Sequence, residues 1–202
     1  LADNTRMLGV FTLEDGLCVE QSMNYISTIL NTMNTPIATM LRTGHPAPYD
    51  EDLYQVIYDC VKSLVYTSGP YFGGFNQADG YDPFNSYAST FKTWYQTLFP
   101  DDENLAWLVS NGTSGKMPEN PTTVYPTSYK TFMRSGWNQK SLQLSFINVS
   151  DMRRSHAHND QLSFAMFAYG QYLLVDPGYG SDHTGDGGRV WKYNKSPVQH
   201  NV

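Results

Sequence analysis

Three histidines and an aspartate in the last quarter of the chain have the residue types and spacing of a metal site. His156 and His158 are separated by one residue and stand just before an apolar run. Residues two apart in extended backbone point to the same face, so these two imidazoles are expected to converge. Asp176 ends a later apolar run, and His200 lies close to the end of the sequence. A carboxylate with two imidazoles suits zinc, and the alternative is that each histidine caps a turn.

A second segment whose side chains could take part in chemistry is DGLCVEQSMNY, residues 15–25. If this segment is helical, Gln21 and Tyr25 lie four residues apart on one face and share it with Ser22. A core helix does not need such a polar stripe, so the stripe is expected to line a site. The alternative is a solvated helix face on which Tyr25 packs by its ring.

The spacing of apolar residues in the elements that must position these side chains changes along the chain. Apolar residues at spacings of three and four predict a helix that begins near Asp15 and ends near Pro36. The same pattern predicts helices over residues 52–66 and 86–98. Alternation with a period of two then predicts strands over 129–134, 141–149, 161–168 and 171–175, with turns at Gly170 and at 176–178. Helices followed by strands, without alternation, predict two domains in series, residues 1–120 and 121–202.

Charge is distributed unevenly between these two parts. Residues 1–120 hold 5 Lys/Arg and 14 Asp/Glu, whereas residues 121–202 hold 8 Lys/Arg and 5 Asp/Glu. The acidic part argues against nucleic-acid binding by the chain as a whole. The basic part contains Arg153, Arg154 and Arg189, which would suit a polyanionic partner, and the alternative is that they are solvated loop charges.

Composition excludes several other classes of protein. Hydrophobic residues make up 40% of the chain and charged residues 16%, which disfavours intrinsic disorder. No apolar run approaches the roughly 18 residues of a membrane span. Cys18 and Cys60 allow at most one bridge, so a disulfide framework is excluded, and we predict two buried free thiols.

Four segments together resemble the heparinase II/III superfamily of polysaccharide lyases. They are DGLCVEQSMNY, YPTSYKTFMRSGW, SHAHNDQLSFAMFAYGQYLLVDPG and the terminal SPVQHNV. The resemblance covers about residues 10–35 and 125–202. It implies an α+β multidomain fold, in which the end of an incomplete (α/α) toroid is followed by the start of an antiparallel β-sandwich, with the active site in the cleft between them. The chain is expected to be a fragment, because the family's charge-neutralising asparagine lies upstream of the tyrosine segment.

The resemblance also implies roles for individual residues. Tyr25 corresponds to the catalytic tyrosine and His156 to its histidine partner. The family's metal ligands correspond to His158, Asp176 and His200. The implied metal is zinc in a structural role, with calcium disfavoured. We further predict that Gln21, Arg153, Arg154 and Arg189 bind substrate, because arginine can hold carboxylates or sulfates bidentately.

The implied reaction is β-elimination in a 4-linked uronic acid polysaccharide. A base removes the C5 proton and an acid protonates the departing O4, which leaves an unsaturated uronate and consumes no water. The expected substrate is a heparan sulfate-type glycosaminoglycan or alginate, met in the periplasm or outside the cell. Two alternatives remain open, a non-catalytic carbohydrate-binding fragment and a metal-dependent glycan hydrolase.

Overall fold

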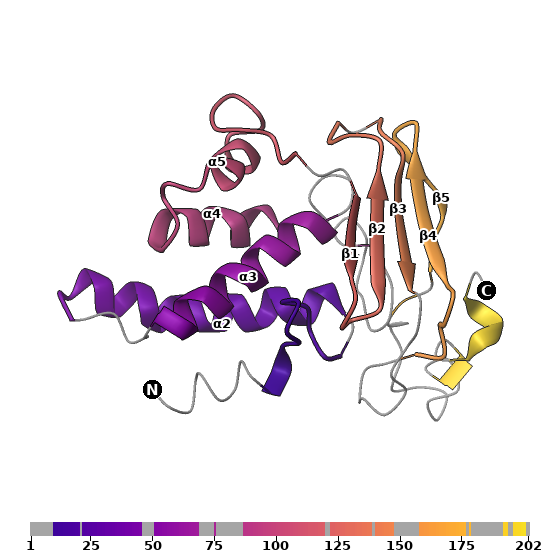
Figure 1. The fold of residues 1–202 in the computed structure, drawn as a ribbon, viewed down its shortest axis with the longest axis horizontal. Helices are drawn as coiled ribbons and strands as arrows, with labels where there is room; N and C mark the ends of the chain where they lie inside the picture. The colour runs from indigo at the N-terminus through magenta and orange to yellow at the C-terminus, as the bar shows by residue number, and fades with distance from the viewer. Residues whose placement is uncertain are drawn as a thin grey trace, which may run out of the picture.

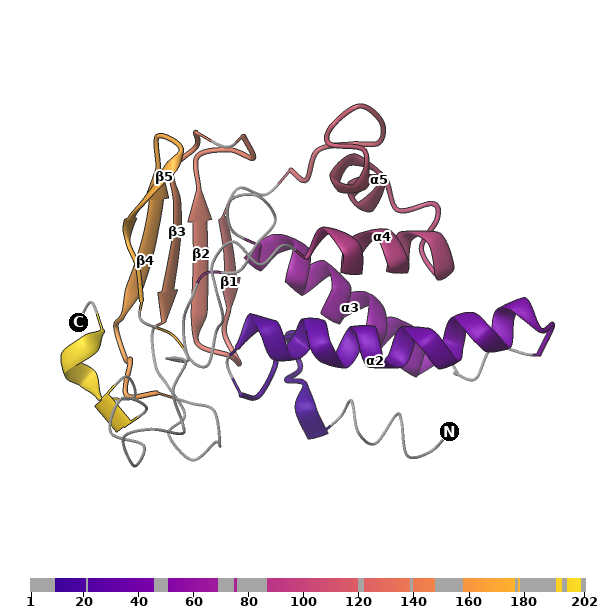
Figure 2. The ribbon, with the colours of Figure 1, turned by 180° about the vertical axis from the view of Figure 1, so that it is seen from behind.

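A layer of helices beside an antiparallel sheet makes up the fold (Figure 1). The computed structural model describes residues 10–20, 22–45, 51–68, 75, 87–119, 122–138, 140–147, 158–176, 178, 192–193 and 196–200. Both views place the helices on one side of the sheet, with β1 as the strand nearest to them (Figures 1 and 2). The predicted order, helices first and strands second, is therefore confirmed.

The helices of the described residues are amphipathic and bury their apolar sides in one core. They are α2 (Met23–Arg42), α3 (Glu51–Thr67), α4 (Ala88–Thr97) and α5 (Glu103–Val109). The two helices predicted over 52–66 and 86–98 are confirmed as α3 and α4. The core that they share includes Ile26, Leu30, Ile57, Leu64 and Trp94, each fully buried.

The first predicted helix had both of its ends wrong. Residues 12–18 form a turn closed by a bridge between Thr12 and Cys18, so the helix begins at Met23 instead of near Asp15. It then continues through Pro36 to Arg42. Proline costs a helix one backbone hydrogen bond, but Ile37, the next residue, is buried, and its packing holds the chain helical beyond the proline.

Helix α5 was not predicted, although the sequence carries its start signal. The Asp102 side chain accepts a hydrogen bond from the Leu105 backbone N–H at 2.8 Å, as an N-cap residue does. The same carboxylate accepts from the Tyr58 hydroxyl at 2.8 Å and pairs with Lys62 at 3.1 Å. Burial alone would raise the pKa of Asp102, but these donors and the Lys62 charge bring it below its ordinary value.

Polar side chains join α2 to α4. Three hydrogen bonds connect α2 with α4 and its N-cap residue Tyr87, and in each the partners are 63 residues apart in sequence. The constant separation means that the two helices run parallel and in register. The pairs are Asn24 with Tyr87 at 2.8 Å, Ser27 with Thr90 at 3.0 Å and Asn34 with Thr97 at 2.9 Å.

The sheet is an antiparallel meander in the order β1-β2-β3-β4-β5. Its strands are β1 (Thr122–Tyr125), β2 (Lys130–Arg134), β3 (Gln143–Ile147), β4 (Phe164–Ala168) and β5 (Gln171–Leu174). The four predicted strands are confirmed with shorter ends, and the turn predicted at Gly170 joins β4 to β5. Strand β1 was missed because it lies in a segment dense in Gly, Pro, Asn and Thr, which are typical of loops.

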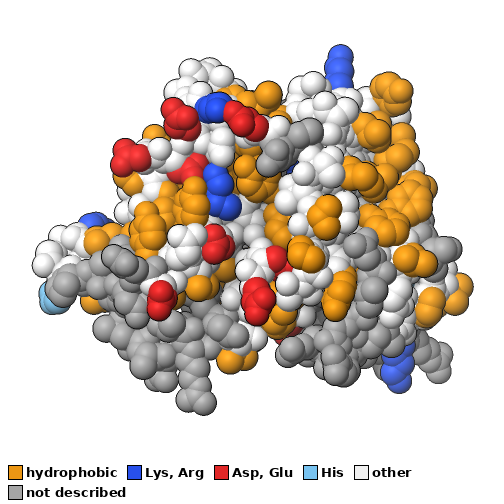
Figure 3. All heavy atoms as spheres, in the orientation of Figure 1, with side chains coloured by type: hydrophobic (Ala, Val, Ile, Leu, Met, Phe, Trp, Pro, Cys, Tyr) orange, Lys and Arg blue, Asp and Glu red, His pale blue; other side chains and the backbone are white. Residues whose placement is uncertain are grey.

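The two faces of the sheet differ in burial. Phe132 and Phe167 lie on the face that meets the helical core and are each 1% exposed. The opposite face carries the register row Met133, Leu144 and Met166, which are exposed or half-buried. Figure 3 shows hydrophobic side chains gathered over the sheet side of the molecule. The described residues contain one sheet, so the β-sandwich and the toroid stay predictions.

Two other sequence expectations can be checked in the fold. Cys18 and Cys60 are both free and buried, as predicted. Burial raises the pKa of the Cys18 thiol to about 11 and that of Cys60 to about 12, so both are protonated and unreactive at neutral pH. Among the described helices, none has the length and apolarity that crossing a bilayer requires.

The segment before α2 is fastened to both the helices and the sheet through Asp15. Its carboxylate accepts hydrogen bonds from the backbone N–H groups of Thr127 and Ser128, at 3.0 and 2.8 Å, in the turn between β1 and β2. Its carbonyl accepts from the Ser63 hydroxyl on α3 at 2.8 Å. The segment that leads into Tyr25 is thereby held against two elements at once.

Gly16 makes this close approach possible and gives a first prediction. Its φ is +78°, and a Cβ there would lie 2.6 Å from the Ser63 Oγ and 2.8 Å from the Asp59 carbonyl oxygen. Gly170 has a similar φ of +84° with nothing within 4 Å of its Cβ position. We expect Gly16→Ala to lower the free energy of unfolding by about 1–3 kcal/mol more than Gly170→Ala, because only the first variant is overpacked. Denaturant unfolding of both variants measures the difference, and equal losses would contradict it.

Candidate functional site

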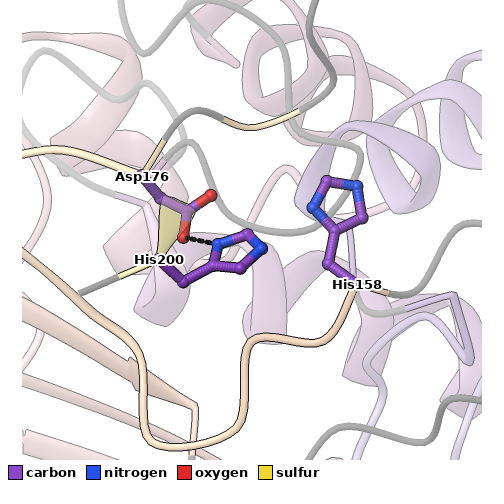
Figure 4. A group of neighbouring side chains, drawn as sticks. All are labelled: His158, Asp176 and His200. Atoms are coloured by element: carbon purple, nitrogen blue, oxygen red, sulfur yellow. Dashed lines mark hydrogen bonds and ion pairs between the residues drawn. The ribbon is translucent and has the colours of Figure 1, made fainter. Parts of the chain in front are cut away.

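Two imidazoles and a carboxylate meet in the buried interior near the C-terminal end of the chain (Figure 4). His158, Asp176 and His200 each offer a ligand atom, and these atoms all lie within 4.8 Å of one another. The His200 Nδ1 lies 2.6 Å from the Asp176 Oδ2, and the two imidazole centroids are 5.4 Å apart. The structure therefore brings together the three residues predicted as metal ligands, from segments 18 and 24 residues apart.

Local structure fixes the Asp176 carboxylate. Asp176 follows β5, and its Oδ1 accepts a hydrogen bond from the Gly178 backbone N–H at 3.0 Å. Its Oδ2 accepts from the Ser163 hydroxyl at 3.1 Å, just before β4. The carboxylate thus bridges the ends of two neighbouring strands and presents an oxygen to His200.

The two histidines reach this carboxylate from separate segments. His158 stands in the stretch that leads into β4, and Figure 4 shows its ring across from Asp176 and His200. His200 ends the 3₁₀ turn η2 (Pro197–Gln199), and its backbone N–H donates to the Pro197 carbonyl at 3.2 Å. Both side chains are buried, so the last turn of the described chain is anchored in the interior by His200.

A lysine and a second aspartate share this interior, and neither was predicted to be buried. Lys130 opens β2 and is 1% exposed; burial lowers its pKa to about 8, opposed by the negative charges of Asp160 and Asp176. Asp160 is fully buried, which raises the pKa of its carboxyl group, while the Lys130 charge acts in the opposite direction. Alternation along β2 places residue 130 on the same face as buried Phe132, which is the signal that a strand prediction offers.

The donor set fits a divalent metal ion. Two neutral imidazoles and one carboxylate are ligands that zinc prefers, and three protein ligands leave a fourth position for another group. The ligands are 1%, 1% and 6% exposed, in the order His158, Asp176 and His200. Such burial suits an ion that holds the chain together better than one that exchanges water or substrate.

Tyr25 lies in the first turn of α2, away from the polar face that joins α4. It is half-buried and packs against the hydrophobic core, while its neighbour Asn24 makes the bond to Tyr87. Figures 1 and 2 both place the N-terminal end of α2 beside the sheet and its C-terminal end far from it. Tyr25, in the first turn of α2, therefore lies at the helix end that is nearer to the sheet.

Several predicted site residues lie outside the described residues. These are Gln21, Arg153, Arg154, His156 and Arg189. The predicted pairing of Tyr25 with His156, and the predicted substrate contacts of the glutamine and arginines, therefore stay predictions. The same holds for zinc, because the geometry supports a metal site without identifying its ion.

Comparison with known proteins identifies similar sequences and folds. Residues 131–202 match the family described as heparinase II/III-like, C-terminal. The chain is similar in fold to heparan sulfate lyase HepC from Pedobacter heparinus, with a TM-score of 0.88 and 16% identity over 100% of this chain and 32% of that one. A heparinase III gene product gives a TM-score of 0.91 with 18% identity over 100% and 32% of the two chains. Another heparinase III structure gives 0.84 with 19% identity over 98% and 33%.

The chain spans about a third of the length of the solved structures that it matches. Comparison with the curated proteins gave no match. The likeness to the solved structures establishes the fold of this part of the protein.

Proposed function

We propose that the full protein is a polysaccharide lyase, because residues 131–202 match the family described as heparinase II/III-like, C-terminal. The reaction is β-elimination at a 4-linked uronic acid, a carbon–oxygen bond cleavage that leaves an unsaturated uronate end. The observation that carries this proposal is the fold similarity, which extends over the whole chain, helices as well as sheet. A carbohydrate-binding module alone would account for the sheet but not for the matched helical layer.

In this proposal Tyr25 and His156 divide the proton transfers. The C5 proton is acidified only by the neighbouring carboxylate, so a base must act while that carboxylate's charge is neutralised. When H5 and O4 lie on the same face of the sugar, the Tyr25 phenolate takes the C5 proton, and the phenol formed in this way then delivers that proton to O4. When they lie on opposite faces, His156 takes the proton and Tyr25 delivers one to O4. The position of Tyr25 at the sheet-facing end of α2 supports this role.

His158, Asp176 and His200 hold a zinc ion in the same proposal. Bound there, zinc supplies positive charge and cross-links the segments before β4, after β5 and after η2. The near-complete burial of all three ligands supports a structural role. It also disfavours the metal-dependent hydrolase, because that reaction needs a metal-bound water within reach of the glycan.

We propose a heparan sulfate-type glycosaminoglycan as substrate and alginate as the second choice. One of the structures similar in fold is described as a heparan sulfate lyase, which supports the first. Gln21, Arg153, Arg154 and Arg189 are proposed to bind the polymer's carboxylates and sulfates. Since such polymers are met outside the cytoplasm, the proposed location is the periplasm or the exterior of a bacterial cell.

A panel of polymers tests the activity. The full protein is incubated separately with heparan sulfate, hyaluronan, chondroitin sulfate and alginate, while the ultraviolet absorbance of C4–C5 unsaturated uronate is followed. We expect the absorbance to rise with heparan sulfate, in step with new chain ends. New reducing ends without unsaturation would identify a hydrolase, and binding without new ends would identify a carbohydrate-binding protein. Either result would refute the lyase proposal.

A further inference from the structure

Asp160 is a buried carboxylate with no hydrogen-bond partner among the described residues. Its side chain is 0% exposed, and neither Oδ1 nor Oδ2 meets a donor in this part of the chain. A buried carboxylate without donors is costly, and proteins retain one where a nearby positive charge compensates it. Asp160 lies two residues after His158, and its carboxyl group interacts electrostatically with His158, Asp176 and His200.

Lys130 is a buried positively charged residue that interacts electrostatically with Asp160. Its strand neighbour across the sheet is Ile147, whose backbone N–H donates to the Ser163 carbonyl at 2.9 Å. Ser163 in turn donates its hydroxyl to Asp176. Lys130, Ile147 and Ser163 are all buried, so they form one inward-facing row that ends at the ligand carboxylate. The electrostatic interactions of Lys130 with Asp160 and Asp176 agree with this placement.

The charge count of this interior changes sign when a cation enters. Among the described residues, the formal charges of Asp160, Asp176 and Lys130 in this buried interior add up to minus one. A divalent cation makes it plus one. Without Asp160 the occupied interior would hold two positive charges, and without Lys130 it would be neutral. Charge interactions are strong where water is excluded, so removal of either charge should change the affinity of the site for the cation.

We propose that Asp160 and Lys130 set the cation affinity of the His158, Asp176 and His200 site with opposite signs. Asp160 strengthens binding as an outer carboxylate that does not join the ligand group, and the Lys130 ammonium weakens binding. Lys130 thereby limits the affinity that two carboxylates would otherwise give. The inference rests on the proposed metal site but does not depend on lyase activity.

Zinc affinity of the full protein, measured by competition with a chromophoric chelator, tests the proposal. We expect Asp160→Asn, which keeps the size of the side chain, to weaken zinc binding about 10- to 100-fold. We expect Lys130→Met to tighten it on the order of tenfold, since a positive charge leaves the interior. Lys130→Gln, which keeps a polar side chain, should shift affinity in the same direction if Lys130→Met does not fold. Asp101→Asn and Lys116→Met make the same changes of charge at exposed positions and should leave affinity unchanged.

If Asp160 and Lys130 acted only through packing, substitution of either residue would weaken zinc binding. Shifts of zinc affinity in opposite directions therefore distinguish the proposed charge effect from a packing role. Weaker binding in both the Asp160 and the lysine variants would overturn the proposal, as would affinities equal to the parent's. If the parent protein itself binds no zinc, the metal site fails and this inference fails with it. The absorbance assay for unsaturated uronate would then still decide the lyase proposal separately.

Discussion

The Tyr25→Phe variant of the full protein is expected to cleave its polymer with a kcat about 100- to 10,000-fold below that of the parent. Phenylalanine keeps the ring that packs against the hydrophobic core, so the first turn of α2 should stay in place. It removes the hydroxyl that we propose donates a proton to O4. Because the loss arises in the transition state, kcat and kcat/KM should fall together while KM changes little.

Tyr95→Phe is the matched control for this experiment. Tyr95 is also a half-buried helical tyrosine packed against the same core, but it lies on α4. It should keep nearly full activity, and thermal unfolding should show both variants folded. A folded Tyr25→Phe variant with parental kcat would remove the phenol from the mechanism. In that case His156, which the mechanism pairs with Tyr25, would have to carry both proton transfers.

The grouping of His158, Asp176 and His200 could be predicted from the sequence because its signals are local. A short run of polar residues before an apolar strand presents His158 towards the interior, and the end of the strand β5 fixes where Asp176 stands. What local spacing could not give is which imidazole of the HxH pair joins the group. That choice came from the family resemblance, and the structure groups His158 with Asp176 and His200.

Other parts of the site depend on pairing between distant segments, which no local pattern encodes. Alternation along β2 places Lys130 on the inward face, but its position opposite Ile147 of β3 and its interaction with the charges of Asp160 and Asp176 depend on segments far away in the sequence. The sequence pattern predicts a helix start near Asp15. Its carboxylate instead accepts hydrogen bonds from the backbone N–H groups of Thr127 and Ser128, more than a hundred residues later. The ends of α2 were mispredicted for the same reason, because tertiary packing overrode the proline signal.

Asp176→Ala is expected to have the largest effect on stability and to lower the free energy of unfolding by about 3–5 kcal/mol. Its carboxylate receives hydrogen bonds from the Ser163 hydroxyl and the Gly178 backbone N–H, and it contacts His200 at 2.6 Å. Alanine would leave these buried groups without their acceptor. Since domains are stable by only about 5–15 kcal/mol, the variant should lose much of its stability at ordinary temperature.

The metal proposal adds a second, separable expectation for Asp176→Ala. A ligand that binds only the folded state raises its stability, so chelation should lower the Tm of the parent protein and added zinc should restore it. The Tm of Asp176→Ala should respond to neither treatment, whereas Asp101→Ala, at an exposed carboxylate, should respond like the parent. A parent Tm unmoved by chelator, together with a large loss in Asp176→Ala, would mean that this carboxylate stabilises the fold by hydrogen bonding alone. Because the two outcomes differ in the parent protein, they separate the role of Asp176 in the fold from its role as a ligand.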